Sequence, residues 1–180
     1  MKILVTGANG LLGQKLVALL QQDKNIELIA TARNTLVASL TRGEFHPLGT
    51  TSKDQVEKVV TKTKPDVIIN TAAMTQVDDC ERDHEACIAN NVTAVENLIY
   101  ASKLVDAHFI HLSTDFIFDG TEGPLDELAE PHPVNFYGES KLAAEQLIRF
   151  SDINWCILRT VLVYGVVPDM SRSNIVLWVK

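Results

Sequence analysis

Two kinds of hydrophobic pattern alternate along the chain. Short runs rich in Val and Ile predict strands, and longer stretches with apolar residues three and four positions apart predict helices. The expected strands are Lys2–Thr6, Ile26–Ala32, Asp66–Asn70, His108–Ser113 and Trp155–Arg159. The expected helices are Leu11–Gln22, Ser52–Thr63, His84–Lys103 and Asn135–Ser151, with a further one beginning at Ser171. Residues 119–136 hold three prolines and two glycines, which predicts a long loop.

This alternation of strands and helices predicts the fold class. Repeated β-α-β units build a parallel sheet, because each right-handed crossover returns the chain to the same end of the sheet. We therefore expect an α/β protein of the Rossmann type, a doubly wound parallel sheet with helices on both faces. The whole chain, residues 1–180, is predicted to form one domain. Ligands of such sheets bind at the carboxyl ends of the strands, so loops that follow strands are searched first.

Charge and composition narrow the function. The chain has 180 residues and a formal net charge of −7, which argues against nucleic acid or an anionic membrane as a partner. No stretch is long and apolar enough for a membrane span, and the N-terminus lacks the pattern of a signal peptide. The three cysteines are scattered and lack metal-ligand spacing, which favours reduced thiols, no bound metal and a cytoplasmic location.

The first expected strand runs into a glycine-rich turn and then a helix. Gly7, Gly10 and Gly13 are each three residues apart, whereas the usual dinucleotide fingerprint has the spacing GxGxxG. Such glycines permit a tight turn, close approach of a pyrophosphate and close packing of helix on strand. The helix N-terminus then offers free N–H groups to phosphate. The position favours a dinucleotide site; the alternative is a structural turn with no ligand.

The end of the second strand bears on the choice of cofactor. An acid is expected there when NAD is bound, because a carboxylate holds the ribose 2′-hydroxyl. This chain has Ala32 followed by Arg33 and no carboxylate. An arginine can meet a 2′-phosphate, so NADP(H) is favoured and NAD(H) is the second option. The alternative reading of Arg33 is a solvated surface residue.

A phenol and an ammonium group lie one helical turn apart in the expected helix Asn135–Ser151. Tyr137 and Lys141 are four residues apart, so they share one helix face. A nearby cation is expected to lower the pKa of the Tyr137 phenol and to make it a general acid. The Tyr-x-x-x-Lys pattern also occurs by chance, but Thr114 and Asp115 follow a neighbouring strand. Asn91, inside the long expected helix, becomes a candidate site residue only in combination with these residues.

Several longer stretches carry a resemblance to a known family. They are the glycine loop, Pro65–Ala73 with Thr75, Val77 and Asp78, the segment from His111 to Gly120, Pro133–Lys141 with Ala143–Glu145, and Arg159, Thr160 with Val163–Gly165. In this order they resemble the extended short-chain dehydrogenase/reductase family, and within it the dTDP-4-dehydrorhamnose reductases. The resemblance implies reduction of the 4-keto group of a nucleotide-linked 6-deoxysugar by NAD(P)H.

The resemblance also implies roles for individual residues. Tyr137 would be the general acid, Lys141 would hold the nicotinamide ribose, Thr114 would polarise the substrate carbonyl, and Asn91 would support a water relay to Lys141. Thr114 and Asp115 would contact the sugar. The residues expected at the cofactor are Gly7, Gly10, Leu11, Leu12, Gly13, Arg33, Ala72, Ala73, Met74, Thr75, Tyr137 and Lys141. A nucleotide sugar is the expected partner, and a homodimer is left open.

The chain departs from the family at several places. Gly49 and Thr50 stand where an acid or polar residue often lies near the adenine. Phe116 replaces a common tyrosine, and Leu162 replaces a tryptophan that packs on the sugar. The family also continues into a C-terminal substrate-binding portion, which this sequence does not contain. These departures bear on the substrate more than on the cofactor.

Two other functions fit the same motifs. Nucleotide-sugar epimerases and dehydratases share the fold and the Tyr-Lys pair. The regulatory subunit of methionine adenosyltransferase resembles these reductases and binds NADP without being the catalyst, so the fold alone does not prove turnover. Thr114, Tyr137 and Lys141 together favour an enzyme.

Overall fold

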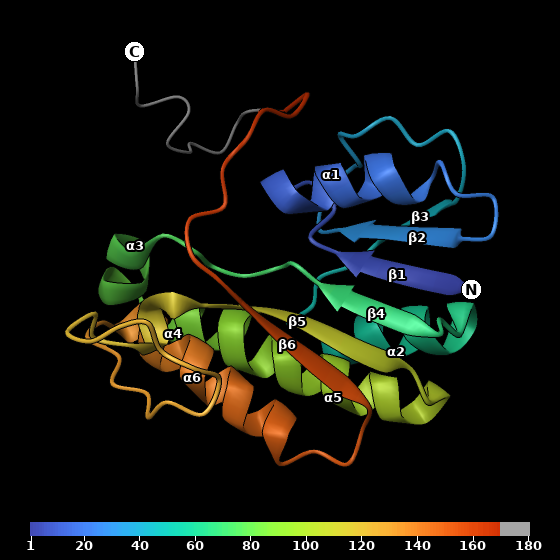
Figure 1. Cartoon of the computed structure of the whole chain (residues 1–180). Helices are drawn as coiled ribbons and strands as arrows, with labels where there is room; N and C mark the ends of the chain where they lie inside the picture. Colours follow the sequence, from blue (N-terminus) through green and yellow to red (C-terminus); the bar gives the residue numbers. More distant parts are fainter. Residues whose placement is uncertain (170–180) are drawn as a thin grey trace.

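A computed structural model describes residues 1–169 of the chain. These residues form a parallel six-stranded sheet with strand order β3-β2-β1-β4-β5-β6 (Figure 1). The strands are β1 (Lys2–Thr6), β2 (Glu27–Ala32), β3 (Glu44–Pro47), β4 (Val67–Asn70), β5 (His108–Thr114) and β6 (Trp155–Thr160). The helices are α1 (Leu11–Leu20), α2 (Lys53–Thr63), α3 (Val77–Arg82), α4 (His84–Ile88), α5 (Ala94–Val105) and α6 (Phe136–Arg149). The expected Rossmann-type fold class is thereby confirmed.

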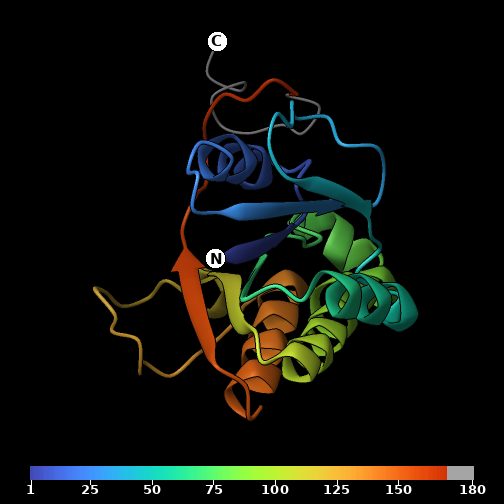
Figure 2. The same cartoon turned by 90° about the vertical axis from the view of Figure 1, so that its right-hand side faces the viewer.

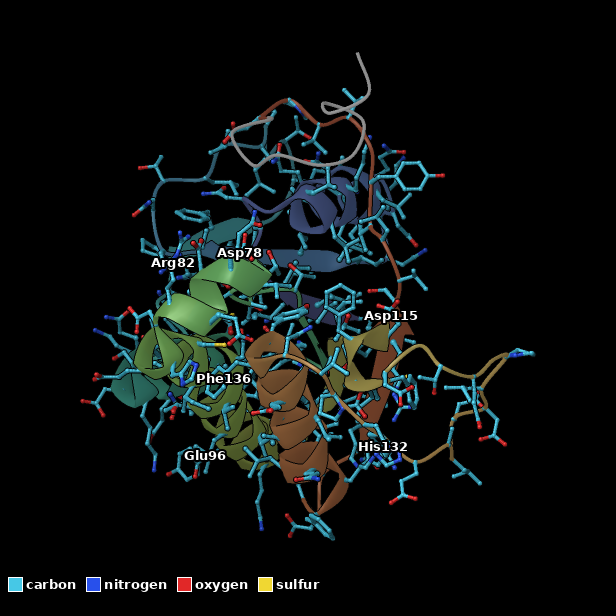
Figure 3. The ribbon with its side chains drawn as sticks, turned by 90° about the vertical axis from the view of Figure 1, so that its left-hand side faces the viewer. Asp78, Arg82, Glu96, Asp115, His132 and Phe136 are labelled. Atoms are coloured by element: carbon cyan, nitrogen blue, oxygen red, sulfur yellow. The ribbon has the colours of Figure 1, made fainter. Side chains whose placement is uncertain are left out.

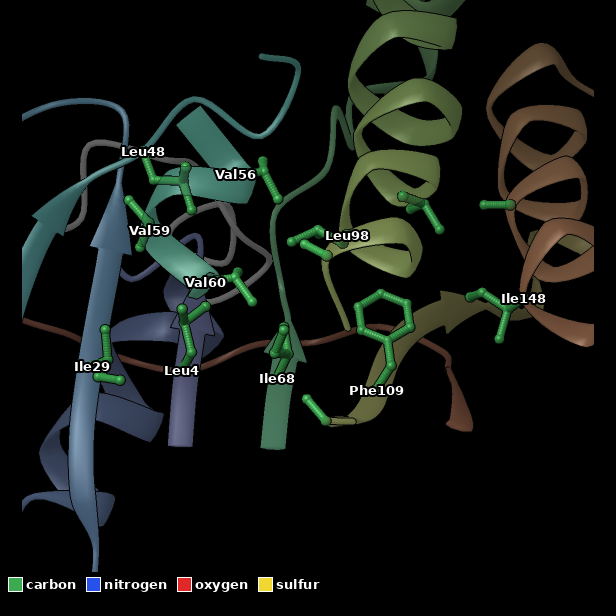
Figure 4. Close-up of a cluster of buried hydrophobic side chains, with 14 residues drawn as sticks. Leu4, Ile29, Leu48, Val56, Val59, Val60, Ile68, Leu98, Phe109 and Ile148 are labelled. Carbon is green, nitrogen blue, oxygen red and sulfur yellow. The ribbon is translucent and has the colours of Figure 1, made fainter. Parts of the chain in front are cut away.

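Helices lie on both faces of the sheet, as Figure 2 shows from the side. α1 covers one face next to β1 and β2, and α2, α5 and α6 pack side by side on the other. Alternate residues of the strands therefore point into two separate hydrophobic cores. The larger core lies under α2, α5 and α6 and includes Leu4, Ile68, Leu98, Phe109 and Ile148 (Figure 4).

The order of the strands creates the crevice where such folds bind ligands. From β1 the chain winds outward to β2 and β3 and then returns to β4 on the other side of β1. The loops after β1 and β4 therefore leave the sheet in opposite directions, and a crevice opens between them at the carboxyl ends. In register, Thr6 of β1 lies beside Asn70 of β4, which lies beside His111 of β5.

The prediction of one continuous α-helix over His84–Lys103 is wrong. A π-helical turn, Ala89–Thr93, separates α4 from α5. The wider turn contains Asn91, whose buried side chain bonds to neighbouring segments rather than to solvent. π-turns of this kind occur often at functional sites because they insert one extra residue into a helix.

Other differences are small and have local causes. Ser52 and Asn135 were expected inside helices but act as N-caps, because their side chains accept from the N–H groups of Gln55 and Gly138. β3 lacks a run rich in Val and Ile, and α3 is too short for a clear helical period, so neither was predicted as an element. The helix expected from Ser171 lies outside the described residues. None of the helices within residues 1–169 is long and apolar enough to cross a membrane.

Candidate functional site

A pocket lies between the carboxyl ends of β1 and β4. It is bounded by the glycine loop on one side, by the end of β2 on another and by the segment after β4. The lining residues are Gly7, Asn9, Gly10, Ala32, Arg33, Asn34, Leu48, Thr50, Thr71, Ala72, Ala73 and Asn90. Five residues of the predicted cofactor set line it, namely Gly7, Gly10, Arg33, Ala72 and Ala73.

The three positions of the loop require glycine for different structural reasons. Gly7 has φ +68°, and a Cβ there would lie 2.8 Å from the backbone nitrogen of Ala72. A Cβ on Gly13 would lie 2.1 Å from the carbonyl oxygen of Gly7, so Gly13 is required for α1 to pack on the loop. Gly10, the N-cap of α1, has an ordinary φ of −73°, and its Cβ would meet the Gly7 oxygen at 3.2 Å. A side chain at Gly10 would therefore affect the pocket more than it would affect the packing of α1.

The first turn of α1 begins directly after Gly10, which lines this pocket. Leu11 and Leu12 begin the helix, no acidic side chain occupies this turn, and Gly10 offers no side-chain cap. The first N–H groups of a helix have no partner within the helix, and they carry its positive dipole end. Leu11 and Leu12 do not line the pocket with their side chains, so any contribution to a phosphate site would come from their backbone.

Arg33 lies at the rim of the same pocket, directly after β2. It is exposed, and its side chain makes no hydrogen bond to the residues that the structure describes. Asn9, Asn34, Leu48 and Asn90 also line the pocket but were not predicted. They come from four separate loops or turns, and no sequence motif connects them.

A second group of residues gathers at the carboxyl end of β5. Thr114 is buried at the last position of the strand, and its hydroxyl donates to Asp115 Oδ1 over 3.1 Å. Asp115 lies at this end of the sheet, near the start of α6 that Phe136 marks (Figure 3). The first turn of α6 packs closely against the backbone of Phe116, since a Cβ on Gly138 would lie 2.2 Å from the Phe116 oxygen. Gly138 therefore allows Tyr137 to lie beside Thr114.

Burial dominates the chemistry of the Tyr137 phenol. Loss of solvent raises the pKa of Tyr137 to about 12, and a hydrogen bond with Thr114 opposes this rise only in part. The expectation that Lys141 lowers the pKa of Tyr137 is wrong for this structure. The Lys141 amine turns toward β5 instead, where it donates to the Leu112 carbonyl oxygen (2.6 Å) and lies 3.0 Å from His111 Nε2. At neutral pH, Tyr137 is thus a protonated phenol.

Lys141 is a deeply buried charged group of this region. It is 2% exposed, and burial lowers the pKa of its amine to about 8. Glu145, one turn further along α6, opposes that shift, but Arg159 of β6 pairs with both of its carboxylate oxygens at 3.1 and 2.8 Å. His111 is also buried, and burial followed by the Lys141 charge holds its pKa well below the usual range.

Asn91 joins the π-turn to the segment after β4. Its Oδ1 accepts from the Met74 N–H (2.8 Å), and its Nδ2 donates to the Met74 oxygen (3.0 Å) and to Ser140 Oγ (3.0 Å). Met74 is therefore held by both of its backbone groups. Within the described residues no hydrogen bond joins Asn91 to Lys141, so the water relay stays a prediction.

The predicted residues thus form two groups and a remainder. The glycine loop, Arg33, Ala72 and Ala73 surround the pocket, while Thr114, Asp115, Tyr137 and Lys141 gather around the end of β5 and α6. Thr75 is exposed beside Met74 and lines neither place. Cys80, Cys87 and Cys156 are free thiols, as expected. Among residues 1–169, no three His, Cys, Asp or Glu side chains cluster as metal ligands would.

The fold and the two groups together define an extended short-chain dehydrogenase/reductase. Such proteins combine a glycine loop after β1 with a Tyr-x-x-x-Lys helix beside the end of β5. More narrowly, the chain belongs to the family described as RmlD substrate binding domain, whose model matches residues 1–177.

The chain is similar to several named proteins. A dTDP-4-dehydrorhamnose reductase of Burkholderia thailandensis is 39% identical over 92% of this chain and 51% of its own length. The methionine adenosyltransferase 2 subunit beta of Xenopus laevis is 32% identical over 97% of this chain and 50% of its own. A dTDP-4-dehydrorhamnose reductase from Bacillus anthracis, solved in complex with NADP, superposes with a TM-score of 0.82 at 31% identity, over 93% of this chain and 56% of that one. The chain spans about half the length of these relatives.

Proposed function

We propose that this chain binds a nicotinamide dinucleotide, NADP(H) in preference to NAD(H). We further propose that it serves the reduction of the 4-keto group of a nucleotide-linked 6-deoxysugar. The observation that carries the proposal is the pairing of a buried hydroxyl, Thr114, with a protonated phenol, Tyr137, at the carboxyl end of β5. Reduction of a carbonyl needs both a hydrogen-bond donor and a proton donor at the oxygen, and these two groups supply them.

The pocket fits the proposed cofactor. The N–H groups at the start of α1 and the bare backbone of Gly10 suit a pyrophosphate, since a side chain there would enter the pocket. Arg33 at the rim suits a 2′-phosphate, and Ala72 and Ala73 allow a ribose to approach their backbone. When bound, the reduced nicotinamide supplies a hydride to the carbonyl carbon.

The chain's own residues then act on the oxygen of that carbonyl. Thr114 donates a hydrogen bond to the oxygen as negative charge develops on it. Tyr137 gives up its proton: the phenol O–H bond breaks, a new O–H bond forms on the substrate, and a phenolate remains. With its pKa raised to about 12, the phenol is protonated at neutral pH and holds the proton to be given, and the forming alkoxide is the stronger base.

Consumption of NADPH with a panel of dTDP-4-keto-6-deoxysugars tests the reductase proposal. Stoichiometric oxidation of NADPH, with one hydroxy sugar formed per NADPH, is the expected result. An epimerase would interconvert sugars without net consumption of NADPH. Absence of any turnover across the panel, together with tight NADP binding, would contradict the enzyme.

That last outcome would favour a non-catalytic NADP-binding regulatory subunit. The specific support for this second candidate is the likeness to the Xenopus methionine adenosyltransferase subunit over 97% of the chain. Thr114, Tyr137 and Lys141 are all present, which supports the enzyme over the regulator.

A further inference from the structure

A row of buried polar side chains crosses the sheet from β1 to α6. Thr6, Asn70 and His111 are neighbours in register on three adjacent strands, and Lys141 reaches the end of the row from α6. Their exposed fractions are 0%, 1%, 1% and 2%. Burying four polar side chains side by side in a core is costly unless every donor meets an acceptor. The directions of the hydrogen bonds in this row therefore carry information.

One donor beside the row, a backbone N–H group, cannot change direction. The backbone N–H of Ala72 points at Asn70 Oδ1 over 3.2 Å, and the Thr6 hydroxyl donates to the same oxygen over 2.5 Å. The oxygen of the Asn70 amide is thereby fixed on this side, because turning the amide would place its NH₂ group against the Ala72 N–H. The Asn70 NH₂ group must then face His111, and its nitrogen lies 3.1 Å from His111 Nδ1.

This orientation determines the rest of the row. His111 Nδ1 faces a donor, so it must carry a lone pair, and the proton of the neutral ring lies on Nε2. Nε2 lies 3.0 Å from Lys141 Nζ. The Nε2–H group needs an acceptor there, and nitrogen has a free lone pair in the amine form of lysine but none in the ammonium form. The amine can still donate to the Leu112 oxygen.

We propose that the row Thr6–Asn70–His111 couples the protonation state of Lys141 to the backbone of Ala72, in the wall of the cofactor pocket. With Lys141 as an amine, every group in the row is satisfied. When Lys141 gains a proton, His111 must offer Nε2 as an acceptor and move its own proton to Nδ1. Asn70 must then rotate, and the Ala72 N–H loses its acceptor. His111 and Asn70 are thus positioning residues.

The other ionisable groups around Lys141 do not replace this row. Tyr137 and Glu145 lie one turn before and after it on α6, and Cys87 of α4 is also near. Charges on Glu145 or Cys87 would raise the pKa of Lys141, but Glu145 is neutralised by Arg159. Burial outweighs them and lowers the pKa of Lys141 to about 8, and His111 is neutral, in agreement with the row.

The consequence for the cofactor rests on the proposed function. A dinucleotide held against Ala72 would favour one arrangement of the row, so its binding would change the protonation of Lys141. The coupling itself exists without cofactor or substrate. Its test can therefore fail while the reductase proposal stands, and the reverse also holds.

The test is a pH titration of the 180-residue chain by NMR, with no ligand present. It follows the ε-methylene signal of Lys141 and the amide signal of Ala72, both assigned from triple-resonance spectra of the unaltered chain. We expect both signals to change with one shared midpoint, below the ordinary range of lysine. Separate midpoints, or an ordinary midpoint for Lys141, would overturn the proposal even if no variant folds.

Two variants sharpen the result. Asn70→Asp has the same shape but offers two acceptors, so His111 can donate from Nδ1 and accept from an ammonium group. The Lys141 midpoint should rise by about one pH unit or more. Asn97→Asp is the matched control, because it adds a carboxylate at another buried asparagine, on α5, outside the row. It should move the midpoint much less.

His111→Phe removes the connection but retains a ring. Lys141 should still titrate below the ordinary range, because it stays buried, while the Ala72 amide should no longer follow it. If Ala72 follows Lys141 equally well in this variant, or if Asn70→Asp and Asn97→Asp shift Lys141 alike, the row does not carry the coupling.

Discussion

The two ends of the candidate site are built from different materials. At the β1–α1 end the surfaces are mainly backbone, and the sequence contributes by omitting side chains at Gly7, Gly10 and Gly13. At the α6 end the chemistry belongs to side chains, namely the buried Thr114 and Lys141 and the half-buried Tyr137. A backbone surface presents N–H groups whose character does not change with pH. The protonation states of the phenol and the amine depend on pH, and burial shifts the pKa of each group.

This difference teaches where each end is vulnerable. The backbone end should fail when a Cβ is added, and the failure should appear as altered packing or blocked binding. The side-chain end should fail when one polar group is removed, with little change in shape. The following predictions test that contrast in order of decreasing effect.

The largest effect is expected from Tyr137→Phe. The change removes one hydroxyl, so turnover of a keto-sugar nucleotide should fall by about 10²–10⁴-fold, the usual contribution of a general acid. Cofactor affinity, measured separately by fluorescence titration, should stay the same. Tyr100→Phe on α5 is the matched control and should retain full turnover. Normal turnover in Tyr137→Phe would remove Tyr137 from the role of acid.

Gly13→Ala and Gly10→Ala should separate packing from binding. The Cβ at Gly13 meets backbone at 2.1 Å, so α1 must move, and the free energy of unfolding should fall by about 2–3 kcal/mol. The Cβ at Gly10 would lie 3.2 Å from the Gly7 oxygen, a tight contact that a shift of a few tenths of an ångström relieves, so that variant should lose less than about 1 kcal/mol but bind dinucleotide poorly. Chemical denaturation and cofactor titration measure the two properties. Equal losses of stability would contradict the assignment.

Arg33→Ala should reduce the preference for NADP over NAD. A charge-assisted hydrogen bond to a 2′-phosphate at an exposed rim contributes about 1.5 kcal/mol, so NADP should bind about tenfold more weakly. The affinity for NAD should not change. Arg42→Ala, an exposed arginine outside the pocket, should alter neither affinity. If the unaltered protein binds both cofactors equally, Arg33 does not read the phosphate.

The smallest effect concerns the stability of Lys141→Met. The folded-state pKa of about 8 lies below 10.5, so the unfolded chain binds more protons between these values. Burial of Lys141 therefore costs about 3 kcal/mol below pH 8, and this cost declines as the pH rises toward 10.5. The hydrogen bonds to His111 and Leu112 return about 1 kcal/mol each.

Lys141→Met should thus be about 1 kcal/mol more stable than the parent at neutral pH. The advantage should shrink and then reverse as the pH rises through the interval from 8 to 10.5. Denaturant unfolding at a series of pH values measures it. A variant less stable than its parent at neutral pH would show that Lys141 is not penalised by burial.

Much of the fold could be predicted from the sequence because its signals are local. The five expected strands and the helices at α1, α2 and α6 occur within one or two residues of their predicted bounds. β3 was missed because its residues, Glu44–Pro47, form no run rich in Val and Ile, and α3 was missed because six residues are too few for a helical period to emerge. The π-turn was missed because its residues fit an α-helical period, and only contacts with Met74 and Ser140 distinguish it.

The site was predictable in its motifs but not in its electrostatics. A Tyr and a Lys four residues apart do share a helix face, yet that spacing does not show where the amine points. The partners of Lys141 lie on β5, about thirty positions away in sequence, and they follow from strand register. Asn70 ends the apolar run of β4, and His111 interrupts the apolar run of β5. A polar residue in a strand that could have been wholly apolar was the sequence signal from which the row could have been predicted.

The π-turn at Ala89–Thr93 also has a consequence for how this region tolerates insertions and deletions. One residue advances an α-helix by about 100°, so a single extra residue resets the angular phase between α4 and α5. α4 can direct Cys87 toward α6 while α5 directs Leu98 and Ala101 into the core. Deleting one residue here would restore a regular helix but turn one of these faces toward solvent. The irregularity works as a rotational spacer, and its length is constrained more strictly than its composition.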